Sequence, residues 1–201
     1  SRETAKIQAE QELKGTIAEQ AADRAFGKYY ANTFIGGGGF ADLATNKAKI
    51  RGVIKDLKEG KLNLTGLDIG AAQFAGRFAL NAIYPDAADA LDKVEAGVQR
   101  NLRVILGAQF TEQEGTRLIA RAYNPFLSEK INANRLERLA NSMESQLKQK
   151  IKAIEYYQNN NQSLRGFKGD IPNLDDVQKI ADSLITEVPT AKEISQWDEN
   201  Y

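Results

Sequence analysis

The longest regular segment of the chain is "SEKINANRLERLANSMESQLKQKIKAIEYYQ", residues 128–158, and its pattern decides the fold class. Ser128 can cap a helix, because a serine hydroxyl accepts from a backbone N–H of the first turn. About 30 residues at 1.5 Å each span about 45 Å, and a helix of that length needs a partner along its face. The apolar residues of this segment recur at intervals of four and three, close to a heptad seam: Leu136, Ala140, Met143, Leu147, Ile151 and Ile154.

Helical spacing continues toward the N-terminus. From Ala5 to Ala25 small or apolar residues recur every fourth position, which predicts a helix whose face allows close packing and which ends before the glycine run. Residues 40–59 predict a second helix, with Gly60 just past its end. The buried face predicted for this second helix consists of Leu43, Ile50, Val53, Ile54 and Leu57.

The segment "LTGLDIGAAQFAGRFALNAIY", residues 64–84, has apolar residues at helical spacing. Asp68, Gln73 and Arg77 interrupt it, so it makes a poor transmembrane span. Gly66 and Gly70 form a G-x-x-x-G pattern, which is typical of close helix packing. We therefore interpret this segment as a helix in a soluble helix–helix contact.

Boundary signals define the remaining helices. Pro85 starts one helix and Gly107 follows it, with acidic residues early and basic residues late. Thr111 and Glu114 form a capping box for another helix, which stops at Asn124-Pro125 because a residue before proline disfavours the helical region. A last short amphipathic helix turns five apolar residues inward: Val177, Ile180, Ala181, Leu184 and Ile185.

Together these patterns predict an all-α fold, an elongated helical bundle with one long helix over about residues 128–158. Gly36, Gly37, Gly38 and Gly39 predict a flexible joint, because four glycines do not hold a helix. They lack the lysine of a phosphate-binding loop and follow no strand. The predicted domain order is an N-terminal helix at 1–35, the glycine joint at 36–39, a helical core at 40–158, a linker at 159–173, and an acidic C-terminal helix and tail at 174–201.

The composition lacks the side chains on which most catalytic sites depend. The chain contains no cysteine and no histidine, which excludes thiol nucleophiles, disulfides, Ser-His-Asp catalysis and the commonest metal ligands. The acids at Asp86 and Asp89 complement a helix N-terminus, and Glu114 serves a capping box. We therefore predict no enzyme activity and no catalytic, cofactor-binding or metal-binding residue.

Charge is distributed in blocks although the net charge is zero. Residues 100–169 carry 12 basic and 6 acidic side chains, a balance of +6, and residues 170–201 carry 2 basic and 8 acidic side chains, a balance of −6. Such blocks either form solvated helix faces or contact a polyanion such as DNA. If they contact DNA, the residues predicted to face it are Arg100, Arg103, Arg117, Arg121, Lys148 and Lys152. The acidic block after Asp170 would then cover this surface until assembly.

Basic and aromatic residues also mix between residues 148 and 168. Tyr156, Tyr157 and Phe167 lie among lysines and arginines. Such rings either stack on single-stranded nucleic acid or serve as core or partner contacts.

Residues 102–169, one third of the chain, contain a series of short motifs: Leu106-Gly107, Gln109-Phe110-Thr111, Glu114-Gly115, the run from Arg121 to Pro125, Asn134-Arg135, and Gly166-Phe167-Lys168-Gly169. In these motifs the segment resembles a part of the internal virion proteins of tailed bacteriophages. The resemblance implies a protein packaged in or near the head–tail axis that helps to move DNA into the host, and it carries over no catalytic residue.

We therefore expect a structural virion component, made in the host cytoplasm, that assembles by helix packing and assists genome ejection. The expected partners are further copies of the chain, other virion proteins and, without sequence specificity, DNA; membrane contact stays open, without a spanning segment to support it. Three alternatives remain: a static capsid or head–tail connector protein, a helical module that binds a host protein through the acidic tail and Trp197, and a fragment of a carboxylate-based enzyme.

Overall fold

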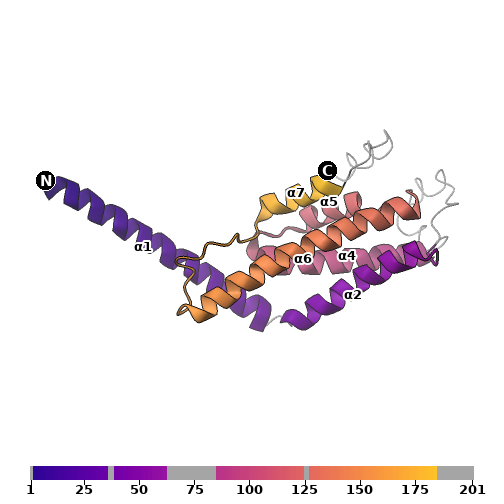
Figure 1. Cartoon of the computed structure of the whole chain (residues 1–201), viewed down its shortest axis with the longest axis horizontal. Coiled ribbons are helices and arrows are strands. Elements are labelled where there is room, and N and C mark those ends of the chain that lie inside the picture. Colours follow the sequence, from indigo (N-terminus) through magenta and orange to yellow (C-terminus); the bar gives the residue numbers. More distant parts are fainter. Residues whose placement is uncertain (1, 36–38, 63–84, 125–126, 185–201) are drawn as a thin grey trace. The chain divides into compact units, whose positions relative to one another are not determined.

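The computed structural model describes residues 2–35, 39–62, 85–124 and 127–184, and all regular elements among them are helices (Figure 1). The all-α prediction is thus confirmed for this part of the chain. The predicted helix within residues 64–84 and three of the four joint glycines, Gly36–Gly38, lie outside it. In chain order the elements are α1 (Arg2–Tyr30), the π-helix η1 (Ala31–Ile35), α2 (Gly39–Lys58), α4 (Pro85–Leu106), the 3₁₀ turn η2 (Gly107–Gln109), α5 (Glu112–Ala122), α6 (Glu129–Asn159) and α7 (Leu174–Leu184).

The predicted helix boundaries agree closely with these elements. The long helix α6 covers Glu129–Asn159, and the Ile131 N–H donates to the Ser128 hydroxyl over 3.4 Å. The capping box at the start of α5 is present in full, with the Thr111 hydroxyl and the Glu114 carboxylate each bonded to the other residue's backbone N–H. Gly60 and Gly107 have φ angles of +67° and +61°, the left-handed conformation that terminates a helix and favours glycine.

The contacts divide the chain into two units. The first unit comprises residues 1–39 and 147–171, and the second comprises residues 40–146 and 172–201. The boundary between the units falls inside α6, whereas the sequence predicted one core over residues 40–158. Most of the predicted linker, residues 159–173, belongs to the same unit as the N-terminal helix. Helical periodicity indicates which face of a segment is buried but not which segment covers it, so the sequence could not give this grouping.

The second unit has the larger core, formed where one face each of α2, α4, α5, α6 and α7 meet. Every residue of the face predicted for α2 is buried, and so are the four described residues of the face predicted for α7. Val94, Val98, Leu102, Leu136, Leu139 and Leu184 are fully enclosed, with 0% of their surface exposed. Residue 185, the fifth predicted for α7, lies outside the described residues.

Two details of the second unit fix its geometry. A Cβ added at Gly97 of α4 would lie 2.9 Å from Ile50 Cγ1 and 3.2 Å from the Asn46 carbonyl oxygen, so the glycine lets α2 and α4 approach closely. Asn132 of α6, with none of its surface exposed, bonds three backbone groups of the turn before that helix: its Oδ1 accepts from the Asn124 N–H, and its Nδ2 donates to the carbonyls of Asn124 and Leu127.

The first unit has a smaller core. Phe26 of α1 packs against Ala153, Ile154 and Tyr157 near the end of α6, with the Phe26 and Tyr157 ring centroids 5.2 Å apart. The segment after α6 contributes three partly buried residues to this cluster, Leu164, Phe167 and Ile171. Residues 159–171 are therefore a packed part of the first unit, although they are polar overall and mostly irregular.

Candidate functional site

The six residues predicted to face DNA do not fall within one unit. Arg100 and Arg103 lie on α4 and Arg117 and Arg121 on α5, all in the second unit. Lys148 and Lys152 lie in the part of α6 that belongs to the first unit, and both are exposed one turn apart. The six residues therefore form two sets, one in each unit: an arginine set in the second unit and a lysine pair in the first.

Most of the arginine set is engaged by carboxylates of the same unit. Arg100 pairs with Asp42 of α2 at 2.5 Å, and Arg121 pairs with Asp182 of α7 at 2.8 Å. Arg103 lies 3.6 Å from Glu112 and stacks over the Phe110 ring, 5.4 Å from its centroid. Paired arginines attract phosphate less than unpaired arginines do, since each partner cancels one charge.

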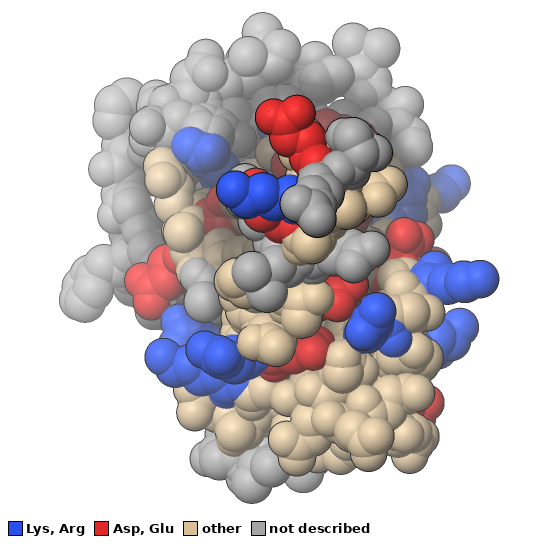
Figure 2. Space-filling model, turned by 90° about the vertical axis from the view of Figure 1, so that its left-hand side faces the viewer, with Lys and Arg blue, Asp and Glu red and all other residues tan. Residues whose placement is uncertain are grey.

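The lysine pair differs from the arginine set in its exposure and in its ion pairing. Within the described residues neither Lys148 nor Lys152 forms an ion pair, and both side chains are exposed. Figure 2 shows lysine and arginine side chains as well as acidic side chains on the face in view. The pattern there is one of mixed charge and not one continuous basic field.

The acidic C-terminal block begins as part of the core and not as a detachable tail. α7 buries Val177, Ile180, Ala181 and Leu184, and Arg138 of α6 donates to the Leu184 carbonyl at 2.6 Å. Asn173 caps this helix, because its Oδ1 accepts from the N–H groups of Asp175 and Asp176. One ion pair, between Asp182 and Arg121, joins the acidic block to the basic block.

The aromatic residues of the basic–aromatic mix lie in the packed cluster of the first unit. Tyr157 is 7% exposed, and its hydroxyl donates to the Asp23 carbonyl at 3.4 Å. Tyr156 packs against Phe167 with ring centroids 5.2 Å apart and donates to the Arg165 carbonyl at 2.7 Å. These contacts favour the core interpretation for the tyrosines over stacking on a nucleic acid.

Sequence reasoning counted Lys150 only as one of the basic residues of the basic–aromatic mix and did not predict its burial. This side chain is 5% exposed, and its ammonium lies over the rings of Tyr29 and Phe26, at 4.0 and 5.5 Å from their centroids. Burial lowers the pKa of Lys150 to about 8. Its position was the available signal, because residue 150 falls on the same helix face as Ala153, Ile154 and Tyr157.

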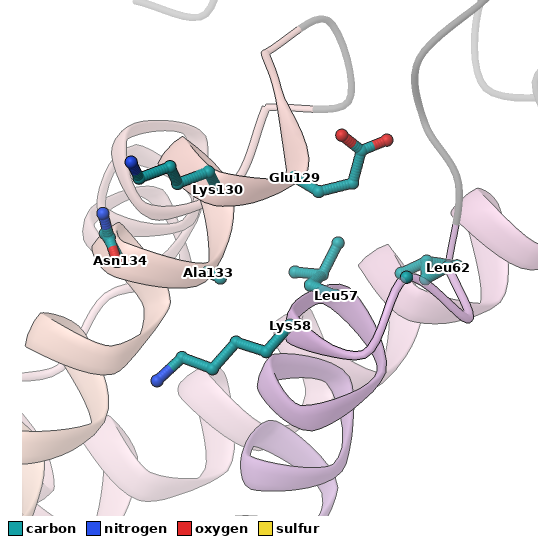
Figure 3. A pocket seen from close by; sticks show the side chains of 8 residues that line it. Leu57, Lys58, Leu62, Glu129, Lys130, Ala133 and Asn134 are labelled. Atoms are coloured by element: carbon teal, nitrogen blue, oxygen red, sulfur yellow. The ribbon is translucent and has the colours of Figure 1, made fainter.

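A cavity of about 500 Å³ opens between the end of α2 and the start of α6 (Figure 3). Leu57, Leu62 and Ala133 form its apolar lining, while Glu129 and Lys130 supply opposite charges. Lys58 also lines it but pairs with Glu137 at 2.9 Å, a bond that lowers the pKa of that carboxyl group. The lining groups have mixed charge and form no set of converging polar side chains, so they define no ligand class.

The residues that the structure describes contain no group of three acidic side chains placed to hold a metal ion. Glu114 is in its predicted capping role, and Asp89 pairs with Lys93 at 2.5 Å on the surface of α4.

No helix within the described ranges is long and apolar enough to cross a bilayer.

The fold and these surfaces define the class of the molecule only broadly: an all-α protein in which many of the described charged residues form ion pairs or helix caps. No protein-family model, no curated protein and no solved structure matches the chain.

Proposed function

We propose that the chain is a non-enzymatic structural component of a phage particle that assembles through helix packing and assists delivery of the genome. The observation that carries the assembly part is the exposure of α1. Residues 3–10 and 16–22 of this helix are exposed, including Ile7 at 54% and Ile17 at 57%. A helix gains most of its stability from packing of one face, so a helix this long is suited to burial in an assembly.

The phage assignment is supported by the resemblance of residues 102–169, and the DNA role by the exposed lysine pair. A static capsid or connector protein would use the same helix packing without a delivery step. A module that binds a host protein is the second alternative. Rings or tubes of the purified protein in electron micrographs would favour the virion proposals, whereas a monomer that captures one host protein would favour the module.

Self-association should depend on the exposed apolar residues of α1. We expect the double variant Ile7→Glu/Ile17→Glu to weaken association at least tenfold, because two carboxylates would have to be desolvated at the contact. Sedimentation velocity over a concentration series measures this. Both side chains are more than half exposed, so the fold of the single chain should not change.

The control for this experiment is Gln8→Glu/Gln20→Glu, which adds the same charge to exposed positions of the same helix. It should associate like the parent chain. A parent chain that stays monomeric at about 100 μM would contradict the assembly proposal. Equal weakening in both double variants would show that net charge controls association and that the isoleucines do not.

DNA binding should be weak, independent of sequence and steeply dependent on salt. Replacing Lys148 and Lys152 by glutamine should lower the slope of log K against log salt by about 1.8, since each phosphate contact contributes about 0.9. The measurement is a salt titration with one duplex. The matched control replaces Lys47 and Lys55, which pair with Glu144 and Glu59 and lie outside the predicted set.

A shortened chain tests the covering role of the acidic block. Deleting all of residues 170–201 would remove α7 from the core, so the deletion should start after Leu184. Residues 185–201 contain 4 acidic and 1 basic residue, and the shortened chain has a net charge of +3 in place of 0. It should bind the duplex more tightly than the full chain. Equal and negligible binding of both chains at low salt would remove the DNA role.

A further inference from the structure

The contact between α1 and the rest of the first unit involves a short stretch of this helix. Polar contacts join the C-terminal part of α1, from Glu19 onward, to residues 157–165. The Asp23 carboxylate accepts from the Leu164 N–H at 2.7 Å, Glu19 lies 3.7 Å from Arg165, and the Gln158 amide donates to the Tyr30 hydroxyl. Among the described side chains of α1, Phe26 is the apolar residue that is buried in the cluster.

A charged group, the ammonium of Lys150, lies against the aromatic side chains of this contact. The Lys150 side chain is 5% exposed among Phe26, Tyr29, Ile154 and their neighbours, and its ammonium contacts the faces of two rings. An ammonium carries three N–H donors, and within the described residues none of the three has a hydrogen-bonded acceptor or a carboxylate partner. Ring faces attract a cation but do not replace all the water that burial removes.

We infer that the contact of α1 with residues 147–171 opens and recloses in the native protein, and that the buried Lys150 ammonium determines how often it opens. Opening returns the ammonium to water and exposes the small apolar cluster around Phe26. The free-energy change on opening is therefore smaller than it would be with an uncharged side chain at position 150. This inference concerns the folded chain itself and does not depend on the proposed function.

The protonation of Lys150 gives the contact a specific pH dependence. In the closed contact the pKa of Lys150 is about 8, and in the open state it should return to the ordinary value of 10.5. The closed state therefore binds fewer protons than the open state between these values, and raising the pH from 8 toward 10.5 favours closing. A difference of 2.5 pKa units corresponds to about a 300-fold range in the opening constant.

Other titratable groups around the contact act outside this window or in the opposite direction. Burial raises the pKa of Tyr29, so ionisation of this phenol favours opening, but only above about pH 10. The charged groups of α1 and of the following segment that take part in the contact are Glu19, Asp23 and Arg165. Only desolvation, and no neighbouring charge, causes the shift of the Lys150 pKa.

The test is hydrogen exchange of the α1 amides from Asp23 to Tyr30 in the parent chain and in Lys150→Met. At pH 7 these amides should exchange up to about 300-fold more slowly in the variant, because methionine fills the site without a charge. The ratio between the two proteins should fall at least tenfold between pH 7 and 9.5. The intrinsic pH dependence of exchange cancels in this ratio.

Lys152→Met is the matched control, since Lys152 is exposed on the same helix. It should exchange like the parent chain. Lys150→Gln, which is polar but uncharged, should also slow exchange, and this would separate the effect of charge from that of side-chain shape. Unchanged or faster exchange in both Lys150 variants, or a ratio that does not vary with pH, would overturn the inference.

Discussion

Replacing Asn132 by alanine is expected to lower the free energy of unfolding of the second unit by about 3 kcal/mol, since buried backbone groups would lose their partners. Asn132 makes bonds of 2.9 and 2.7 Å to the N–H and carbonyl of Asn124, and a third of 3.3 Å to the Leu127 carbonyl. Its side chain has no exposed surface, so water does not reach these groups after the substitution without a rearrangement of the turn.

Urea unfolding followed by circular dichroism at 222 nm measures this loss of free energy. A second variant, Asn132→Asp, tests whether the two bonds to carbonyl groups matter. Aspartate keeps the acceptor for the Asn124 N–H but places a carboxylate against two carbonyl oxygens, so it should be at least as harmful as alanine. Asn134→Ala is the control, because Asn134 is exposed on the same helix, and it should cost less than about 0.5 kcal/mol. A loss below about 1 kcal/mol in Asn132→Ala would show that the three bonds contribute little.

Gly97→Val is expected to lower the free energy of unfolding by about 3 kcal/mol, because it inserts a branched side chain where α2 and α4 are in close contact. The first added carbon would already lie 2.9 Å from Ile50 Cγ1. Ile50 is 2% exposed and belongs to the core, so it has little room to move. The backbone oxygen of Asn46, 3.2 Å from the same Cβ position, cannot move without shifting α2.

Gly52→Val provides the matched comparison. A Cβ at Gly52 of α2 would meet nothing within 4 Å, so the same substitution adds no clash there. Valine has a slightly higher helix propensity than glycine, and the expected change is within about 0.5 kcal/mol of the parent chain. Similar losses at both positions, measured by the same urea titration, would mean that helix propensity and not close packing determines the effect at Gly97.

Much of the fold could be predicted from local patterns. The helix boundaries at Pro85, Thr111 and Ser128 depend on a ring constraint and on side chains that bond backbone groups a few residues away. The buried faces of α2 and α7 follow from the 3.6-residue period, which places apolar side chains on one side of each helix. Such interactions act within a single segment, so one segment of sequence contains the information for them.

The candidate surfaces were less predictable. The excess of basic residues over residues 100–169 is correct as a count, but it does not show that Arg100 meets Asp42 or that Arg121 meets Asp182, partners that are 58 and 61 residues away. Burial of a lysine is also invisible to a charge count, because its four-carbon stem can lie in a core while the ammonium rests on aromatic rings.

By itself, the sequence determined that the described chain is helical, where its helices begin and end, and which faces of α2 and α7 are buried. Local backbone bonding and periodicity decide these properties. Only the tertiary structure decided that residues 147–171 pack with α1, that α7 belongs to the core, and that Lys150 is buried whereas Lys148 and Lys152 are exposed. Those outcomes depend on which apolar faces cover one another, and many pairings of similar helical faces satisfy the same local pattern, so contacts distant in sequence select among them.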